Sequence, residues 1–388
     1  MPSLSHRVNS FTDSVIRRMT RIADAHGAIN LSQGFPDFDP PREIMDALAC
    51  AAHHGPHQYA VTFGAPDFRE ALVKKHEMFS GLSYDPQEEV VVTCGGTEAM
   101  ICAMMAVCNP GDKAVVFSPF YENYAADAIL SGAEPIYVPL VPPDFHIDEA
   151  ALKAAFSQGP KVIVVCNPSN PCGKVFREDE LLLIARLAEE HDCFVITDEV
   201  YEHMVFDGVP HISAARHPML RERTFVVSSF GKTFHVTGWK IGTVCAPAPL
   251  TAEFRKVHQY TVFTANSPMQ HGIAAYLSDP RPYVELPAFY QAKRDRFAAG
   301  LAQTPLRALA CEGSYFQCAS YADISELRDF SERDCCEWMT REIGVTPIPV
   351  SAFYSTPTEQ QVIRFCFAKR DSTLDAALAR LLRLAPPR

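Results

Sequence analysis

Two lysines stand among small residues in a pattern that could support covalent chemistry. The segment S-S-F-G-K-T-F-H-V-T-G-W-K at 228–240 contains Lys232 and Lys240, and it follows the apolar run at 224–227. Most lysines are solvated. However, Gly231 permits a tight turn at the end of such a strand, which would bring the amine of Lys232 into a cleft. A lysine withdrawn from water loses proton affinity and can attack a carbonyl carbon to form an imine.

A carboxylate and an amide side chain follow two other apolar runs. Asp198 comes directly after the run at 194–197, and Tyr201 lies three residues further on, facing the same way if the turn is helical. A buried aspartate needs a cationic partner, although a single aspartate could equally cap the next helix. Asn170 lies in the N-P-S-N-P segment at 167–171, a pattern that usually only makes a turn.

A glycine-rich helix start and an aromatic pair complete the set. In the segment T-C-G-G-T-E-A-M at 93–100, Gly96 and Thr97 lie where free backbone amides could hold a phosphate, although many such turns bind nothing. Phe120 and Tyr121 end another apolar run, where core packing is the usual role. Because the carboxyl ends of parallel strands meet at one rim of a sheet, these segments together predict a single ligand site at that rim.

The elements that would position these residues follow an α/β pattern. Between residues 90 and 246, Val- and Ile-rich runs alternate with helical patterns, which indicates parallel strands buried on both faces of a sheet with helical layers. The strands are predicted at 90–93, 114–117, 161–165, 194–197, 225–228 and 241–245, and the helices at 97–107, 121–130 and 178–191. Beyond about residue 281, a helix at 289–301 and short strands near Tyr315 and Ile363 predict a second, smaller domain.

Composition narrows the class of protein. The 388 residues are 47% apolar and carry a formal net charge of −11, which predicts no nucleic-acid partner, because phosphate contacts need a basic surface. The 13 cysteines form no C-x-x-C pair and the histidines show no metal-ligand spacing, so neither a disulfide framework nor a metal site is predicted. Without a secretory signal or an apolar stretch of ~20 residues, the chain is predicted to be cytoplasmic and to bind no membrane.

Together these motifs resemble those of the pyridoxal-phosphate-dependent aminotransferases of class I/II, fold type I, and most of all the methionine and kynurenine (glutamine-phenylpyruvate) aminotransferase group. The resemblance runs almost end to end and includes the motifs I-N-L-S-Q-G-F-P-D-F at 29–38, H-Q-Y-A at 57–60, T-D-E-V-Y-E-H at 197–203 and I-R-F-C-F-A-K at 363–369. It implies an α/β fold with a mostly parallel central sheet in a large domain and a smaller α+β domain. The implied division is 1–42 for an N-terminal arm and part of the small domain, 43–280 for the large cofactor-binding domain, and 281–388 for the C-terminal small domain.

The resemblance assigns the central chemistry to three residues. Lys232 is implied to bind pyridoxal phosphate covalently and later to move a proton between the substrate Cα and the cofactor. Asp198 is implied to keep the cofactor's ring nitrogen protonated, so that the ring can accept electrons. Tyr201 is the third implied catalytic residue. Tyr201 and Asn170 match the donors that hold the phenolic oxygen of the cofactor.

The remaining matched positions hold the rest of the cofactor and the substrate. Tyr121 matches the ring that stacks on the cofactor, and Tyr59 matches a tyrosine that reaches the phosphate from the neighbouring subunit, which implies a homodimer with composite sites. The substrate carboxylate is implied to bind Arg364, with Asn170 and the closing loop at Gly34 beside it. The implied phosphate cradle consists of Gly96, Thr97, Ser229 and Lys240.

The implied activity moves an amino group from an uncharged, medium-to-large amino acid to a 2-oxo acid by a ping-pong mechanism. The donor would be of the methionine, phenylalanine, glutamine or kynurenine type. Ile16 and Thr264 stand where some kynurenine-handling relatives carry an aromatic residue and a histidine, so a preference for aromatic substrates stays open. An apolar side-chain pocket is expected from Phe35, Phe263, Phe353 and Tyr354.

Three other functions compete with this one. A β-lyase that cleaves cysteine conjugates or cystathionine could use the same scaffold, and the sequence does not separate the two activities. A non-catalytic binding protein of the same fold is disfavoured because Lys232, Asp198 and Arg364 are all present. A nicotinamide-dependent dehydrogenase ranks last, because no G-x-G-x-x-G follows the early strands.

Overall fold

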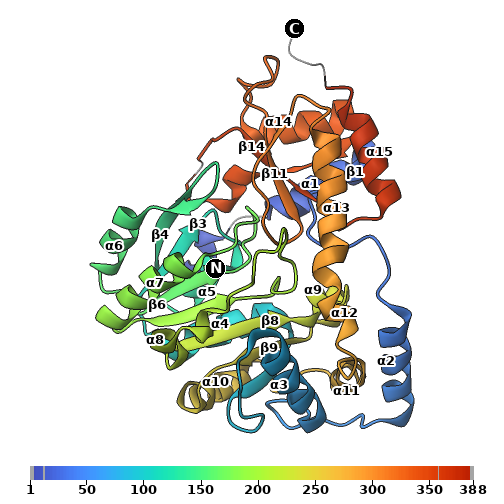
Figure 1. Ribbon diagram of the computed structural model, residues 1–388. Helices are drawn as coiled ribbons and strands as arrows, with labels where there is room; N and C mark the ends of the chain where they lie inside the picture. The colour runs from blue at the N-terminus through green and yellow to red at the C-terminus, as the bar shows by residue number, and fades with distance from the viewer. Residues whose placement is uncertain (1–3, 12–13, 357, 385–388) are drawn as a thin grey trace.

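A central sheet forms the body of the molecule. The computed structural model describes residues 4–11, 14–356 and 358–384, and Figure 1 shows them as a ribbon. Within these residues eight strands form one sheet in the order β2-β9-β8-β7-β6-β3-β4-β5. The strands are β2 (Val90–Thr93), β3 (Lys113–Ser118), β4 (Glu134–Val141), β5 (His146–Ile147), β6 (Val162–Cys166), β7 (Phe194–Asp198), β8 (Thr224–Ser229) and β9 (Gly242–Cys245).

The sheet is mostly parallel, as predicted, but one predicted parallel strand runs the other way. β8 pairs in parallel with β7, β7 with β6, β6 with β3 and β3 with β4. β9 is antiparallel to both β8 and β2, so the prediction of a parallel strand at 241–245 is wrong. The reason is the connection from β8, which holds only α9 (Phe230–Thr233) and the 3₁₀ turn η3 (Thr237–Trp239) and is too short for a crossover helix. Since β2 is antiparallel to β9, it runs in the same direction as β8.

The parallel strands are buried on both faces because their side chains alternate between two apolar layers. In β3 and β6, Val115 and Ile163 pack in one cluster, and Val116 and Val164 pack in another on the opposite face. Helices cover both faces (Figure 1). They are α4 (Gly95–Val107), α5 (Asn123–Leu130), α6 (Glu149–Phe156), α7 (Glu178–Glu190), α8 (Pro218–Arg221) and α10 (Ala248–Thr261), with α2 (Arg42–His54), α3 (Pro66–Ser80) and α11 (Ser267–Tyr276) beside β2 and β9.

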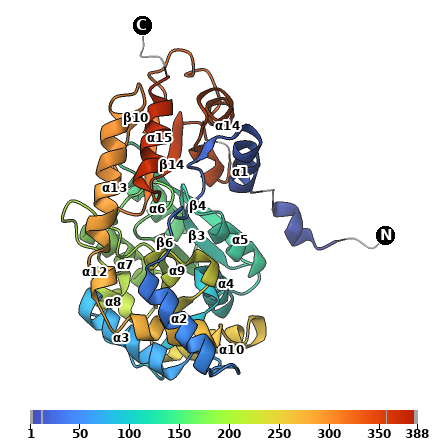
Figure 2. The same cartoon turned by 90° about the vertical axis from the view of Figure 1, so that its right-hand side faces the viewer.

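A second sheet lies over the first at one end of the molecule. Its strands have the order β10-β11-β14-β13 and are antiparallel, and a two-stranded parallel ladder joins β1 to β12 nearby. Figure 2 shows α1 and β14 at this end and the 3₁₀ turn His6–Ser10, in dark blue, lying away from the body. The elements are β1 (Ile29–Asn30), β10 (Arg307–Ala308), β11 (Phe316–Ser320), β12 (Val345–Thr346), β13 (Ile348–Pro349), β14 (Val362–Cys366), α1 (Val15–His26), α12 (Arg281–Val284), α13 (Leu286–Leu301), α14 (Glu332–Trp338) and α15 (Asp371–Leu381).

The long helix α13 contains the predicted helix at 289–301 and begins three residues before it. One apolar cluster joins the N-terminal residues Met19 and Leu31 to residues from α13, β11, β14 and α15. The chain start and the chain end therefore share a core, while the domain boundaries near 42 and 280 stay a prediction. No helix in the described part of the chain is long and apolar enough to cross a membrane.

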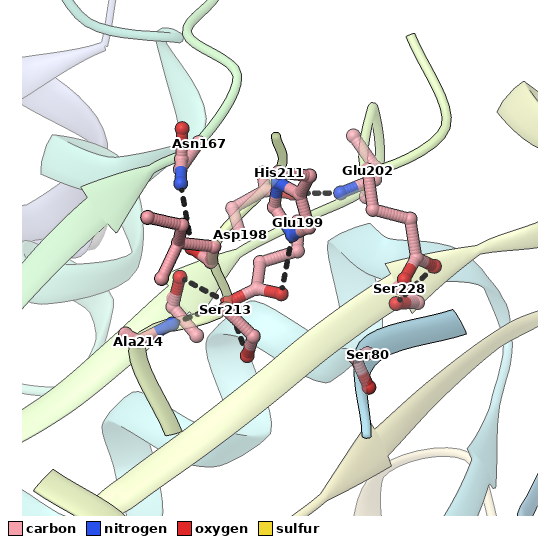
Figure 3. A network of polar contacts seen from close by, with 12 residues as sticks. Ser80, Asn167, Asp198, Glu199, Glu202, His211, Ser213, Ala214 and Ser228 are labelled. Carbon is pink, nitrogen blue, oxygen red and sulfur yellow. Dashed lines mark hydrogen bonds and ion pairs between the residues drawn. The ribbon is translucent and has the colours of Figure 1, made fainter. Parts of the chain in front are cut away.

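A buried polar network fixes the ends of β7 and β8 (Figure 3). The Glu199 carboxylate accepts hydrogen bonds from Thr197 Oγ1 at 3.0 Å, Ser213 Oγ at 2.9 Å and the Ala214 backbone N–H at 3.1 Å. Glu202 accepts a hydrogen bond from Ser228 Oγ at 3.0 Å. These contacts tie the segment that follows β7 to its surroundings, on which the placement of the neighbouring site depends.

The same network contains a buried ion pair between Lys75 on α3 and Glu202. The exposed fractions of the two side chains are 1% and 3%. Burial lowers the proton affinity of two histidines close by, so that His76 has a pKa of about 3 and His203 a pKa well below its usual value. Both histidines are therefore neutral at physiological pH, and Lys75 remains the cation that balances Glu202.

We expect that removing both charges of this pair costs less free energy of unfolding than removing one of them. Glu202→Gln leaves the Lys75 ammonium buried without a counter-charge, and should lower the free energy of unfolding by about 3–5 kcal/mol. The double variant Lys75→Met/Glu202→Leu removes both charges and should lose much less. Urea unfolding followed by circular dichroism measures both. A double variant that loses as much as Glu202→Gln would show that the loss in the single variant does not arise from an unpaired buried ammonium.

Candidate active site

A cavity of about 280 Å³ lies where the carboxyl ends of the central strands face the second sheet. Every predicted site residue except Tyr59 lines it: Gly34, Gly96, Thr97, Tyr121, Asn170, Asp198, Tyr201, Ser229, Lys232, Lys240 and Arg364. These residues are spread over more than 300 positions of sequence, from 34 to 364. The fold therefore gathers the predicted set in one place, whereas the role of each residue stays a prediction.

Lys232 lies on the short helix that begins directly after β8. Gly231 is needed there because a Cβ would stand 3.0 Å from Thr237 Cα on the returning segment. The Lys232 amine donates hydrogen bonds to the Tyr315 hydroxyl at 3.0 Å and to the Gly34 carbonyl oxygen at 3.2 Å. Burial lowers its pKa to about 8, against the opposing attraction of Asp198. A substantial fraction of this amine is therefore neutral and nucleophilic near physiological pH.

Asp198 is the last residue of β7 and is held by two donors. The Tyr124 hydroxyl donates to its Oδ2 at 2.6 Å, and the Val200 backbone N–H donates to its Oδ1 at 3.2 Å. Burial raises the pKa of the Asp198 carboxyl, while these two hydrogen bonds and the Lys232 ammonium lower it. A cation placed beside Asp198 would further stabilise the ionised form.

The N-terminus of α4 forms an anion cradle at the opposite side of the cavity. Gly95 has a left-handed φ of +78° at the start of the helix, and Lys240 has a left-handed φ of 54°, which is uncommon for a residue with a side chain. The Lys240 amine donates to Thr97 Oγ1 at 3.3 Å. A Cβ at Gly242 would lie 2.6 Å from the Gly95 carbonyl carbon, so β9 can pack against this turn only with a glycine there. Free backbone amides, a helix dipole and an ammonium thus converge.

Arg364, on β14, is a buried cation with unused binding capacity. Its guanidinium donates to Asn170 Oδ1 at 2.7 Å and to the Ser32 carbonyl oxygen at 2.8 Å. Its central carbon lies 4.0 Å from the centre of the Phe316 ring and 4.7 Å from that of Phe353. Among the described residues the Nε–H finds no acceptor. Burial lowers the pKa of Arg364, and an incoming carboxylate would satisfy both its charge and its free donor.

Tyr121 and Tyr201 supply aromatic walls. Tyr201 is buried, its ring meets that of Tyr315 edge to face at 5.1 Å between centroids, and burial raises the pKa of its hydroxyl well above the usual value. Tyr121 packs edge to face with Tyr124 at 5.8 Å, and burial raises its pKa to about 12. Both hydroxyls are therefore protonated at neutral pH and can act as donors.

Tyr59 lies outside the cavity within a single chain. Its exposed fraction is 78%, and its ring packs edge to face against that of Phe263 at 5.1 Å. The predicted contact of Tyr59 with a cofactor phosphate in the neighbouring subunit therefore stays a prediction.

The expected apolar pocket is composed differently from the prediction. Phe35, Phe263, Phe353 and Tyr354 do not line the cavity, whereas Ile16, Met100, Val200 and Phe316 do. Phe35 and Phe263 are instead exposed, at 43% and 41%. The other two are used elsewhere, since Phe353 lies against the Arg364 guanidinium and the Tyr354 hydroxyl donates to Gln360. Ile16, which stands where some kynurenine-handling relatives carry an aromatic residue, therefore lines the cavity.

Sequence reasoning missed Tyr124 and Tyr315, which hold the two central groups. Tyr124 lies three positions after Tyr121, on the same helical face, so its spacing could have indicated it. Tyr315 donates to the Gly34 carbonyl oxygen at 2.6 Å and accepts from Lys232, two contacts across 281 and 83 positions of sequence. No local pattern signals such contacts.

Comparison with known proteins agrees with this geometry. The family model for "Aminotransferase class I and II" matches residues 26–381. A methionine aminotransferase of Escherichia coli (strain K12) is 42% identical over 372 residues, which cover 96% of each chain. Kynurenine--oxoglutarate transaminase 3 of Rattus norvegicus is 35% identical, covering 96% of this chain and 88% of that one. A crystal structure from Escherichia coli, which identifies a methionine aminotransferase function, superposes with a TM-score of 0.96 at 40% identity and covers 99% of this chain and 100% of that chain.

The chain belongs to the class I and II aminotransferases, and its fold is the fold type I of that family. Enzymes of this family depend on pyridoxal phosphate, and they move amino groups between amino acids and 2-oxo acids. The resemblance read from the sequence is thereby confirmed.

The low proton affinity of Lys232 can be tested without any ligand. Reductive methylation with formaldehyde and cyanoborohydride modifies only neutral amines, so the rate at Lys232 should rise with pH through a midpoint of about 8. Exposed lysines should follow their ordinary pKa of about 10.4. Peptide mass spectrometry over pH 6–10 gives the rate at each lysine, and Lys232→Arg identifies the peptide. A Lys232 midpoint equal to that of exposed lysines would contradict the burial argument.

Proposed function

We propose that this protein is a pyridoxal-phosphate-dependent aminotransferase that takes its amino group from an uncharged, medium-to-large amino acid and transfers it to a 2-oxo acid in two half-reactions. The donor is of the methionine, phenylalanine, glutamine or kynurenine type. The observation that carries the proposal is the meeting, in one cavity, of a buried amine of lowered pKa with a buried carboxylate, an anion cradle and a buried guanidinium.

The residues present fit pyridoxal phosphate. The cradle of Gly96, Thr97, Ser229 and Lys240 suits a phosphate, and Asp198 suits a protonated ring nitrogen. Tyr121 would cover a face of the ring, and Tyr201 and Asn170 would donate to its phenolic oxygen. When bound, the cofactor supplies an electron-accepting ring conjugated to the carbon that carries the amino group.

The protein's own residues then bind, orient and move protons. Lys232, with its amine held between Tyr315 and Gly34, would be the base that takes the proton from the substrate Cα and delivers it to the carbon that receives the amino group. Asp198, held in place by Tyr124, would offer a negative charge to the ring nitrogen. Gly34, Phe316 and Arg364 line the cavity from the side of the second sheet, where they would help to exclude water.

The cavity lining favours an uncharged substrate side chain. Arg364 is the cation available for the substrate α-carboxylate, with Asn170 already bonded to it. Lys232, Lys240 and Asp198, the other charged side chains in the described lining, are taken up by the cofactor. The remaining surface is provided by groups such as Ile16, Val200 and Phe316, which have no charge to offer an acidic or basic side chain.

A second copy of the chain would complete the site. Tyr59 has its side chain in solvent and its ring contacts that of Phe263, and the nearby chain positions Val61, Tyr260 and Val262 are also exposed. Apolar side chains gathered in this way are typical of an interface. In a homodimer, Tyr59 of each subunit would reach the phosphate of the other, and such an assembly fits a cytoplasmic enzyme.

The function is tested by reconstitution. Added pyridoxal phosphate should give an imine absorbance band that shifts on addition of an amino acid, and borohydride should fix the cofactor to the peptide containing Lys232. Lys232→Ala should lose at least a thousandfold in kcat, because it lacks both the covalent linkage and the base. Arg364→Lys should chiefly raise KM, since the planar fork is lost.

A panel of amino donors with several 2-oxo acids completes this test. Stoichiometric exchange of 2-oxo acids supports transamination. Release of pyruvate and ammonia without an acceptor would identify a β-lyase instead. An imine absorbance band that does not shift on addition of amino acids would indicate a binding protein.

The composite site predicts complementation between two inactive variants. Tyr59→Ala damages the site of the partner, whereas Lys232→Ala damages its own, so a mixed dimer retains one intact site. With equal coexpression and random pairing, activity should return to about a quarter of the wild-type value. Each variant purified alone is the control. If the mixture stays as inactive as its components, Tyr59 acts within its own chain, whereas full activity of Tyr59→Ala alone would show that Tyr59 has no role in the site.

A further inference from the structure

The helix α5 and the residues just before it direct three side chains toward the end of β7. Tyr124 and Asp127 are three positions apart on α5 and share one face of it, and Tyr121, just before the helix, packs edge to face with Tyr124. Tyr124 donates to Asp198, and Asp127 lies one turn further along. The exposed fraction of Asp127 is 4%. A second buried carboxyl thus lies close to Asp198 without lining the cavity, and neither the motifs nor the proposed mechanism uses it.

Nothing in the described surroundings neutralises Asp127. Its Oδ2 has no hydrogen-bond partner, and its carboxyl forms no ion pair with a described residue. The titratable groups that face it are Tyr121 from its own segment, Cys102 from α4 and Asp198 from β7, which are neutral or negatively charged. A buried carboxylate without a cation is costly, so the protonated form is favoured. Burial, and secondly the negative charge of Asp198, raise the pKa of Asp127 to about 8.

We propose that Asp127 is a positioning residue of the cofactor site: a carboxylic acid that stays protonated behind Asp198, so that a single negative charge faces the cofactor ring at neutral pH. This inference rests on the proposed function for its last step only. When Asp127 ionises on the alkaline side, a second negative charge appears beside the site and strengthens the binding of protons by the groups that Asp198 pairs with. Asp127 acts through Asp198 and touches no reacting atom.

The protonation state can be measured in the cofactor-free protein. A group whose folded pKa lies above its unfolded value of 3.8 binds its proton more tightly in the folded state. The wild type should therefore lose stability relative to Asp127→Asn as the pH rises, with the loss beginning near the unfolded pKa and ending near pH 8. The expected change in the ratio of folding equilibrium constants is up to about tenfold per pH unit.

Urea unfolding of both proteins from pH 5 to pH 9, at one protein concentration, gives this ratio. Asp329→Asn, at an exposed position, is the matched control and should show no such slope. If Asp127→Asn fails to fold, Asp127→Ala gives the same comparison, because only the pH slope is used. A stability difference that is constant across this range overturns the proposal.

The coupling to the site is measured on the loaded enzyme. The imine absorbance of the wild type and of Asp127→Asn should titrate alike while Asp127 is protonated and diverge on the alkaline side, where the wild type keeps more of the protonated imine because a second anion favours it. Titrations that coincide over the whole range up to pH 9, together with a clear stability slope, would also overturn the proposal, since Asp127 would then be a buried acid without influence on the site. If the wild type binds no cofactor at all, the proposed function fails while the stability slope still decides the protonation of Asp127.

Discussion

The desolvation of one amine is the constraint on which the site depends. Lys232 is removed from water by elements from distant parts of the chain, among them the Gly34 loop and Tyr315. Burial costs the ammonium its hydration, which makes the amine available as a nucleophile, but an unpartnered amine would be mobile and unstable. The Tyr315 hydroxyl and the Gly34 carbonyl oxygen hold the Lys232 amine in place, because they accept its hydrogen bonds and add no formal charge.

The charged side chains around this amine give the cavity an excess of positive charge. The cations Lys232, Lys240 and Arg364 line the cavity, and Asp198 is the anion among the described lining residues. A site with this excess of positive charge attracts a phosphate and a carboxylate. The negative charges of Glu199 and Glu202 lie outside the cavity lining, where hydrogen bonds and Lys75 compensate them. The same short segment, 198–202, thus supplies one anion that lines the cavity and two that stabilise the surrounding structure.

Much of the fold could be predicted from the sequence because buried parallel strands have a distinctive apolar pattern. Runs such as Val162–Cys166 are buried on both faces and are therefore apolar throughout, which distinguishes them from helices and from half-exposed strands. The direction of β9 was not readable, because an apolar run looks alike in either direction. Strand β4 was missed for a related reason, since its exposed and buried positions mix proline and glutamate with apolar residues.

What the sequence by itself determined is a set of side chains that line the cavity, including Lys232, Asp198, Asn170 and Arg364. These follow from local patterns and from a family resemblance that the comparisons confirm. Only the tertiary structure decided which groups control them. Tyr315 reaches Lys232 across 83 positions, and packing brings the buried Asp127 of α5 near Asp198 at the end of β7. Such partners are chosen by packing, because hydrogen bonding and charge depend on distance and burial in space, which a linear pattern does not encode.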